Sequence, residues 1–201
     1  MNNIDIAIIG AGSAGSIIAN KLLTKTNFNI ALIEAGPKDN NPIIEVPLGY
    51  GMTFYNKKIN WNFYSEKQDN LFKRQIYYPR GKVLGGSGSI NAMVFARGSR
   101  NDFDEWGANA SGWSWEDIEP FFRKMETWKG KSDQSRGQSG PVRVTDVSTQ
   151  AHPLTNCYLE ATEQIGISKN PDYNTGNIEG SFVYQTNTHK GLRSSAANAY
   201  L

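Results

Sequence analysis

The first 36 residues alternate between short apolar runs and a segment with helical periodicity. Apolar runs occupy Ile4–Ile9 and Phe28–Ile33, and Ala14–Thr24 lies between them. Within that middle segment the apolar positions recur at helical spacing, at Ile17, Ile18, Leu22 and Leu23. Short apolar runs predict strands, and apolar residues every three or four positions predict an amphipathic helix. We therefore predict a strand–helix–strand unit with parallel strands, the repeating unit of an α/β fold.

The pattern weakens after this unit and becomes regular again near residue 114. Residues 37–79 lack strong periodicity but are rich in aromatic residues. A connection of this length is unusual unless it covers something, so we expect an excursion over the first unit, with most aromatic side chains in a core. Polar residues 129–140 predict a loop. The later predicted elements are a helix capped by Ser114, a strand at Pro141–Val147, a helix at Pro153–Ile165, a strand at 182–188 and a helix starting at Ser194 or Ser195.

The first apolar run ends in the motif Gly10-x-Gly12-x-x-Gly15. In this pattern the first glycine permits a tight turn, the second lets a pyrophosphate approach the backbone, and the third lets the helix pack closely. The helix N-terminus then offers free N–H groups to phosphates. Glu34 ends the second strand, where a carboxylate accepts hydrogen bonds from a ribose diol and disfavours NADP. NAD and FAD both fit this motif, and a strand-to-helix turn without a ligand is the alternative.

Composition and charge narrow the class of protein. The chain has 201 residues and a net charge of +2 from 21 basic and 19 acidic side chains, which gives no electrostatic case for nucleic acid or an anionic membrane. No apolar run is long enough for a transmembrane segment. The single cysteine, Cys157, excludes an internal disulfide and a cysteine-based metal site, and we expect it to be buried in a helix. We predict no metal and a cytoplasmic location, with a peripheral position at the inner face of a membrane as the alternative; oligomeric state is left open.

A second glycine-rich segment runs from Arg80 to Asn91, with the sequence RGKVLGGSGSIN. Its glycines again bring backbone close to a ligand. Ser87 and Ser89 are suitable helix caps, so we predict a helix over Ile90–Ala96.

This second motif, followed by AMVFARG, resembles the signature of the glucose–methanol–choline (GMC) flavoprotein oxidoreductases, and the chain resembles their choline dehydrogenase branch. Further matches extend over the whole chain, among them GAGSAG at 10–15, NWNFYSE at 60–66, RNDFDEWG at 100–107 and GLRSSAANAYL at 191–201. The resemblance implies FAD as the cofactor. It implies an incomplete, Rossmann-like FAD-binding domain over 1–140, to which 190–201 return. Residues 141–189 would begin an α+β substrate-binding domain.

The resemblance also assigns roles to residues. The first glycine loop would hold the pyrophosphate, Glu34 the adenosine ribose, and residues 85–87 the phosphates and the sugar-alcohol chain, so that two helix N-termini converge on the cofactor. The segment after it would approach the isoalloxazine. Ile90 replaces a histidine that links FAD covalently in some relatives, which implies a non-covalent flavin. The implied cofactor-binding residues are Gly10, Gly12, Ser13, Ala14, Gly15, Glu34, Ala35, Gly85, Gly86, Ser87, Asn91, Ala92, Met93 and Val94.

The activity that the resemblance implies is hydride transfer from a primary alcohol to FAD. Family members carry a catalytic His pair near the C-terminus, and we expect it to lie beyond Leu201, which makes this chain an N-terminal portion that is inactive alone. The chain's own histidines, His152 and His189, are expected at the surface. Trp61 and Tyr64 are candidates for a cation-binding cage or for simple packing. A non-catalytic flavin-binding module and an NAD-dependent dehydrogenase are the alternative functions.

Overall fold

The computed structural model describes residues 3–131 and 134–201, and the chain divides into two compact units. The first unit contains the chain up to Met93 together with Lys190–Leu201, and the second contains Val94–His189. Packing therefore groups residues 94–140 with the second unit. The functional division at residue 140 stays a prediction.

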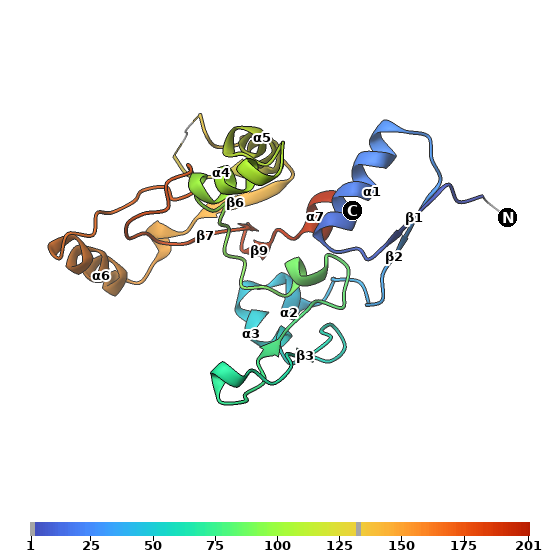
Figure 1. Cartoon of the computed structure of the whole chain (residues 1–201), viewed down its shortest axis with the longest axis horizontal. Coiled ribbons are helices and arrows are strands. Elements are labelled where there is room, and N and C mark those ends of the chain that lie inside the picture. Colours follow the sequence, from blue (N-terminus) through green and yellow to red (C-terminus); the bar gives the residue numbers. More distant parts are fainter. Residues whose placement is uncertain (1–2, 132–133) are drawn as a thin grey trace. The chain divides into compact units, whose positions relative to one another are not determined.

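The first unit begins with the predicted strand–helix–strand arrangement (Figure 1). Strand β1 (Ile6–Ile9) leads into helix α1 (Ser13–Lys25), and β2 (Ile30–Ile33) follows. The two strands are parallel, and their register runs from the pair of Ile6 with Ile30 to the pair of Ile9 with Ile33. The α/β prediction is thus confirmed, with each predicted strand shortened by two residues at its N-terminal side.

The C-terminal segment returns to this βαβ unit through helix α7 (Ala196–Tyr200), which packs along α1 (Figure 1). The side-chain amide of Asn20 on α1 donates to the Tyr200 carbonyl (2.9 Å). Ser195 caps α7 in a capping box with Asn198, which confirms one of the two predicted starting points. Strand β9 (Leu192–Arg193) precedes the helix.

Residues 37–79 are more ordered than the sequence predicts. Their elements are α2 (Pro42–Glu45), η1 (Pro47–Gly49), α3 (Tyr50–Thr53), β3 (Phe63–Tyr64), η2 (Asp69–Leu71) and β4 (Tyr77–Tyr78), with β3 and β4 antiparallel. Two of their residues, Ile44 and Ile59, pack with Val83 and Ile90 in a buried aliphatic cluster. The predicted aromatic core is therefore wrong. The aromatic rings pair with one another instead, as Tyr55 and Tyr77 do at 5.3 Å, and most stay exposed.

Among its described residues the second unit contains three α-helices, a short 3₁₀ helix and a mixed sheet. Its elements are α4 (Arg100–Asn109), α5 (Trp115–Met125), β5 (Glu126–Trp128), β6 (Val142–Asp146), η4 (Ser148–Gln150), α6 (Pro153–Gln164), β7 (Gln185–Thr186) and β8 (Thr188–His189). Strand β6 lies between β5, which is parallel to it, and β7, which is antiparallel. The helix after Ser114, the strand at 141–147 and the helix from Pro153 are confirmed. Helix α4 and strand β5 were missed, although Ser99 and Asp102 form a capping box that starts α4.

Two other sequence predictions for this unit need correction. The strand predicted at 182–188 shrinks to the short β7 and the first residue of β8. Cys157 is exposed and not buried as expected, because Thr162 is the buried residue of α6. Among the described residues, no helix is long and apolar enough to cross a membrane.

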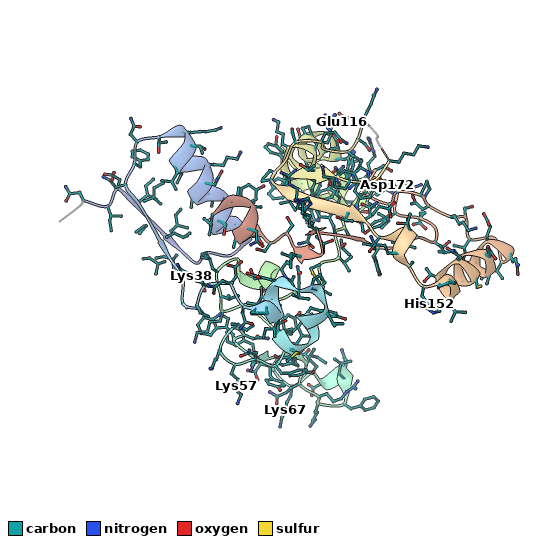
Figure 2. All side chains as sticks on the ribbon, turned by 180° about the vertical axis from the view of Figure 1, so that it is seen from behind. Lys38, Lys57, Lys67, Glu116, His152 and Asp172 are labelled. Atoms are coloured by element: carbon teal, nitrogen blue, oxygen red, sulfur yellow. The ribbon has the colours of Figure 1, made fainter. Side chains whose placement is uncertain are left out.

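A buried ion-pair network holds the second unit together. The carboxylate of Glu126 accepts from Arg97 Nη2 (2.7 Å) and Arg136 Nε (2.7 Å), and all three side chains are fully buried. Arg136 also reaches Asp172 (2.7 Å), which Figure 2 labels. Burial lowers the pKa of Arg97, whereas the two carboxylates outweigh burial at Arg136 and raise its pKa. The network links β5 to the loops on either side of it.

Candidate cofactor-binding site

The first glycine loop connects β1 to α1. Gly10 has φ +92°, a conformation that favours glycine. A Cβ on Gly15 would lie only 2.0 Å from the Gly10 carbonyl oxygen, so the third glycine permits the close packing of helix on turn. Gly12 is the N-cap of α1; no side chain caps the helix and no acid lies in its first turn. The first N–H groups of α1 therefore have no side-chain anion of their own.

Glu34 holds this loop from the end of β2. Its Oε2 accepts from the Ala11 amide (2.9 Å), and its Oε1 accepts from the Gly36 amide (3.0 Å). Sequence reasoning assigned Glu34 to a ribose alone and missed this structural role. Each carboxylate oxygen has two acceptor positions, so the side chain keeps capacity for further donors.

The second glycine loop contacts the first. The Gly85 amide donates to the Ala11 carbonyl (2.8 Å), and a Cβ on Gly86 would lie 2.8 Å from the Cα of Gly12. Both Gly85 (φ +86°) and Gly86 (φ +60°) adopt positive φ. The two glycine motifs, about 70 residues apart in sequence, thus meet as one backbone surface.

The predicted helix at Ile90–Ala96 is wrong. The loop instead forms a single 3₁₀ turn, η3 (Gly86–Ser89). Ser87 accepts from the Gly81 amide (3.0 Å), and Ser89 donates to the Leu84 carbonyl (2.8 Å), so neither caps an α-helix. Asn91 Oδ1 then accepts from the Met93 amide (2.9 Å), and Met93 has φ +61°. These local side-chain bonds compete with helix formation.

A cleft of about 560 Å³ lies where the two glycine loops meet the end of β2. Its lining residues are Ile9, Gly10, Gly12, Ile33, Glu34, Ala35, Trp61, Phe63, Arg80, Gly81, Gly86 and Ser87. Six of the predicted cofactor residues are in this set. Sequence reasoning did not assign the other six to the cofactor, and Trp61, Phe63 and Arg80 are three of them. The sequence features that could have identified these three residues are the NWNFYSE match at 60–66 and Arg80, the first residue of the second glycine motif.

The added wall of the cleft is aromatic. Trp61 and Phe63 stack with ring centroids 5.8 Å apart and planes 5° apart. Lys82 Nζ lies 4.7 Å from the Trp61 ring centroid, a cation–π contact. Tyr64, the other cage candidate, lines a different hollow with Tyr78 and Arg80. Trp61 and Tyr64 thus line adjoining hollows that share Phe63 and Arg80.

The remaining predicted residues lie outside this lining. Ser13 and Ala14 are exposed in the first turn of α1, Gly15 and Gly85 pack inside the loops, and Asn91 and Ala92 are exposed next to the buried Met93. Val94 belongs to the second compact unit.

Neither histidine is placed in this cleft. His152 and His189 belong to the second unit and are exposed, as expected. His152, labelled on Figure 2, is the N-cap of α6, where its Nδ1 accepts from the Leu154 amide (3.2 Å). In the described parts of the chain, no three acidic, histidine or cysteine side chains are grouped as metal ligands would be.

A parallel βαβ unit with an uncapped helix, a glycine loop and an acid at the end of the second strand defines a dinucleotide-binding protein of the Rossmann-like class. The comparisons with known proteins narrow this class. Residues 4–201 match the model of the GMC oxidoreductase family, to which the chain therefore belongs. This family and its solved members use FAD.

Among curated proteins, an oxygen-dependent choline dehydrogenase of Rhizobium etli is 41% identical over 198 residues. An alcohol dehydrogenase [acceptor] of Pseudomonas putida is 40% identical over 200 residues. In both cases the match covers 98% of this chain and 36% of the relative, so the chain spans about a third of their length.

Solved structures agree. Pyridoxine 4-oxidase from Mesorbium loti superposes with a TM-score of 0.92 at 30% identity, over 98% of this chain and 39% of that chain. An FAD-dependent oxidoreductase from Chaetomium thermophilum gives 0.88 at 30% identity, over 99% and 36%.

Proposed function

We propose that this chain is the FAD-binding part of an alcohol dehydrogenase of the choline dehydrogenase type, and that its FAD is held without a covalent link. The observation that carries this proposal is the contact of the two glycine loops at one cleft. The high identity to choline and alcohol dehydrogenases supports the substrate class, a small primary alcohol.

The pyrophosphate is proposed to lie over the first turn of α1 and the adjoining Gly86. The N–H groups of this turn carry the positive end of the helix dipole, and no acidic side chain of the helix competes for them. A Cβ on Gly12 would meet nothing nearer than the Gly86 Cα at 4.0 Å, so the loop surface is open to a ligand. Ser13, Ala14, Gly15, Gly85 and Ser87 complete this proposed phosphate site.

The adenosine is proposed to occupy the end of the cleft near β2. The unused acceptor positions of Glu34 suit a ribose diol, and Ala35 lies beside it. The flat face of Trp61, already stacked on Phe63, suits a planar base. We therefore assign Trp61 to the nucleoside instead of a choline cage.

The isoalloxazine is proposed to contact Asn91, Ala92, Met93 and Val94. Ile90, next to them, is aliphatic and buried in the Ile44 cluster, so it offers no nucleophile for a covalent flavin bond.

When bound, FAD supplies the acceptor for the hydride that leaves the alcohol carbon. An alcohol hydroxyl must also lose its proton to a nearby base. The described histidines are exposed in the second unit. We propose that the base lies in a part of the protein that corresponds to the remaining length of the longer relatives.

A titration tests the cofactor. We expect added FAD to lose fluorescence on binding to the chain, with NAD failing to compete; tight NAD binding without FAD binding would instead favour a nicotinamide-dependent dehydrogenase. A second assay follows reduction of a dye by choline. We expect none from these 201 residues, and turnover would show that the base lies within them. Binding without turnover in the longest natural form of the protein would favour the non-catalytic flavin module.

The proposed location is cytoplasmic. The exposed thiol of Cys157 suits a reducing compartment, in which it stays free. Fractionation of cells that express a tagged protein tests this.

A further inference from the structure

Arg193 is a buried cation beside the second glycine loop. Its side chain leaves β9, and the residue is only 5% exposed. Nε donates to the Ile44 carbonyl (2.8 Å), and Nη1 donates to Asn91 Oδ1 (2.8 Å) and the Gly88 carbonyl (3.3 Å). All three acceptors are neutral, and Nη2 is buried without a partner among the described residues. Among the described residues, no carboxylate forms an ion pair with this arginine.

Such a placement is costly. Transfer of an ion from water to a protein interior is unfavourable by several kcal/mol unless an opposite charge compensates it. Burial accordingly lowers the pKa of Arg193 to about 10, which still leaves the guanidinium charged at neutral pH. The ion pairs elsewhere in the described chain all use other cations. The three hydrogen bonds go to neutral acceptors, so they do not by themselves account for the buried positive charge.

Arg193 also donates a hydrogen bond to a strained turn. Asn91 Oδ1 accepts both from Arg193 and from the Met93 amide (2.9 Å), and Met93 holds φ +61°. Positive φ in a non-glycine residue is unfavourable and persists only where its surroundings enforce it. The planar guanidinium fixes Asn91 through one nitrogen while a second nitrogen anchors α2 at Ile44. A flexible ammonium would not reach these acceptors in the same fork.

We infer that Arg193 is a positioning residue of the FAD site, whose charge complements the cofactor pyrophosphate from behind the second glycine loop and whose hydrogen bonds set the Asn91–Met93 turn. The inference rests on the proposed function. The pyrophosphate is the partner because the loop that Arg193 contacts at Gly88 begins at Gly86, which touches Gly12 of the phosphate loop. Because Nη2 is buried, the guanidinium would attract the pyrophosphate through space and without a direct hydrogen bond.

The test uses ADP, which has the phosphates of FAD but no flavin, beside FAD itself. We expect Arg193→Gln to lower the affinity for both ADP and FAD about tenfold or more, because both ligands lose the same electrostatic attraction. Arg193→Lys keeps the charge, so its affinity for ADP should stay within about threefold of the wild-type value. Its affinity for FAD should fall, because the Asn91–Met93 turn is altered. Lys21→Gln, on the exposed side of α1, makes the same change in charge and should leave both affinities unchanged.

A second variant separates charge from structure. Asn91→Asp keeps the Oδ1 acceptor and gives Arg193 a carboxylate, so the apoprotein should melt at a higher temperature while its ADP affinity falls. ADP makes no contact with the proposed flavin region, so loss of the Asn91 amide does not confound this result. A lower melting temperature for Asn91→Asp, or unchanged ADP affinity in Arg193→Gln, would overturn the inference.

The outcomes distinguish the two proposals. If the wild-type protein binds neither ADP nor FAD, the proposed function fails, and the melting temperature of Asn91→Asp still decides whether the buried charge is uncompensated. If Arg193→Gln does not fold, the opposite changes in stability and ADP affinity in Asn91→Asp decide the role of the charge.

Discussion

Replacement of Glu126 by glutamine tests the buried network of the second unit. The substitution keeps the size of the side chain but removes its charge. Oε1 of Glu126 accepts from Arg97 Nη2 (2.7 Å), Arg136 Nε (2.7 Å) and the Gly137 amide (2.9 Å), and Oε2 accepts from Arg136 Nη2 (3.1 Å). A glutamine offers a single acceptor oxygen and turns an N–H₂ group toward donors. Glu126→Gln therefore leaves two buried guanidinium groups short of acceptors.

The two arginines are affected unequally. Arg136 keeps its ion pair with Asp172, whereas the Arg97 side chain keeps the Ser135 carbonyl (2.9 Å) as its one remaining acceptor among the described residues. Removal of one partner from a buried ion pair typically costs about 3–5 kcal/mol. We expect a loss of this size in the free energy of unfolding, which lowers the folded-to-unfolded ratio by roughly 10²–10³ or more, at about 1.4 kcal/mol per factor of ten.

Urea unfolding followed by tryptophan fluorescence measures this loss. Trp128 is a suitable reporter, because the Arg136 guanidinium lies 4.0 Å from its ring centroid. The matched control is Glu119→Gln, which breaks the half-exposed pair with Arg123 (3.0 Å) on α5. Such surface pairs are worth about 0.5 kcal/mol. If Glu126→Gln destabilises the protein no more than Glu119→Gln does, the network does not stabilise the unit and our reasoning is wrong.

Three further changes probe the cleft and the second unit. Gly86→Ala places a Cβ 2.8 Å from the Gly12 Cα, so we expect calorimetry to show FAD affinity reduced at least about tenfold, and unchanged affinity would argue against contact of the loops. Glu34→Gln removes a carboxylate that accepts from Ala11 and Gly36, and should weaken FAD by about tenfold in the same assay. Burial raises the pKa of Tyr173 above its unfolded value of about 10. The stabilisation that the protonated phenol gives to the fold is therefore complete below about pH 10 and declines as the pH rises further. Tyr173→Phe should therefore flatten the loss of stability above about pH 10 in urea unfolding, and an equally steep loss would contradict this.

Local patterns predicted the first βαβ unit well. Helical and strand periodicity lies within a few residues, and a turn such as Gly10 depends on backbone sterics that no distant contact changes. Capping likewise acts over three residues, and Ser114 and Ser195 were found from it. Periodicity failed at Ile90–Ala96, where Asn91 bonds the Met93 amide and the chain turns instead of forming a helix.

The sequence by itself determined the class of ligand: the glycine motif and Glu34 indicate a dinucleotide, and the family resemblance carried by the second motif implies FAD. Tertiary structure decided which residues meet at the cleft. Trp61 and Arg80 join Glu34 there, and Arg193 reaches Asn91 across 102 positions of the chain. No period or short motif encodes such contacts, because they depend on how separate segments pack. The same packing leaves Arg193 buried without a carboxylate, a charge that the sequence alone would place at the surface.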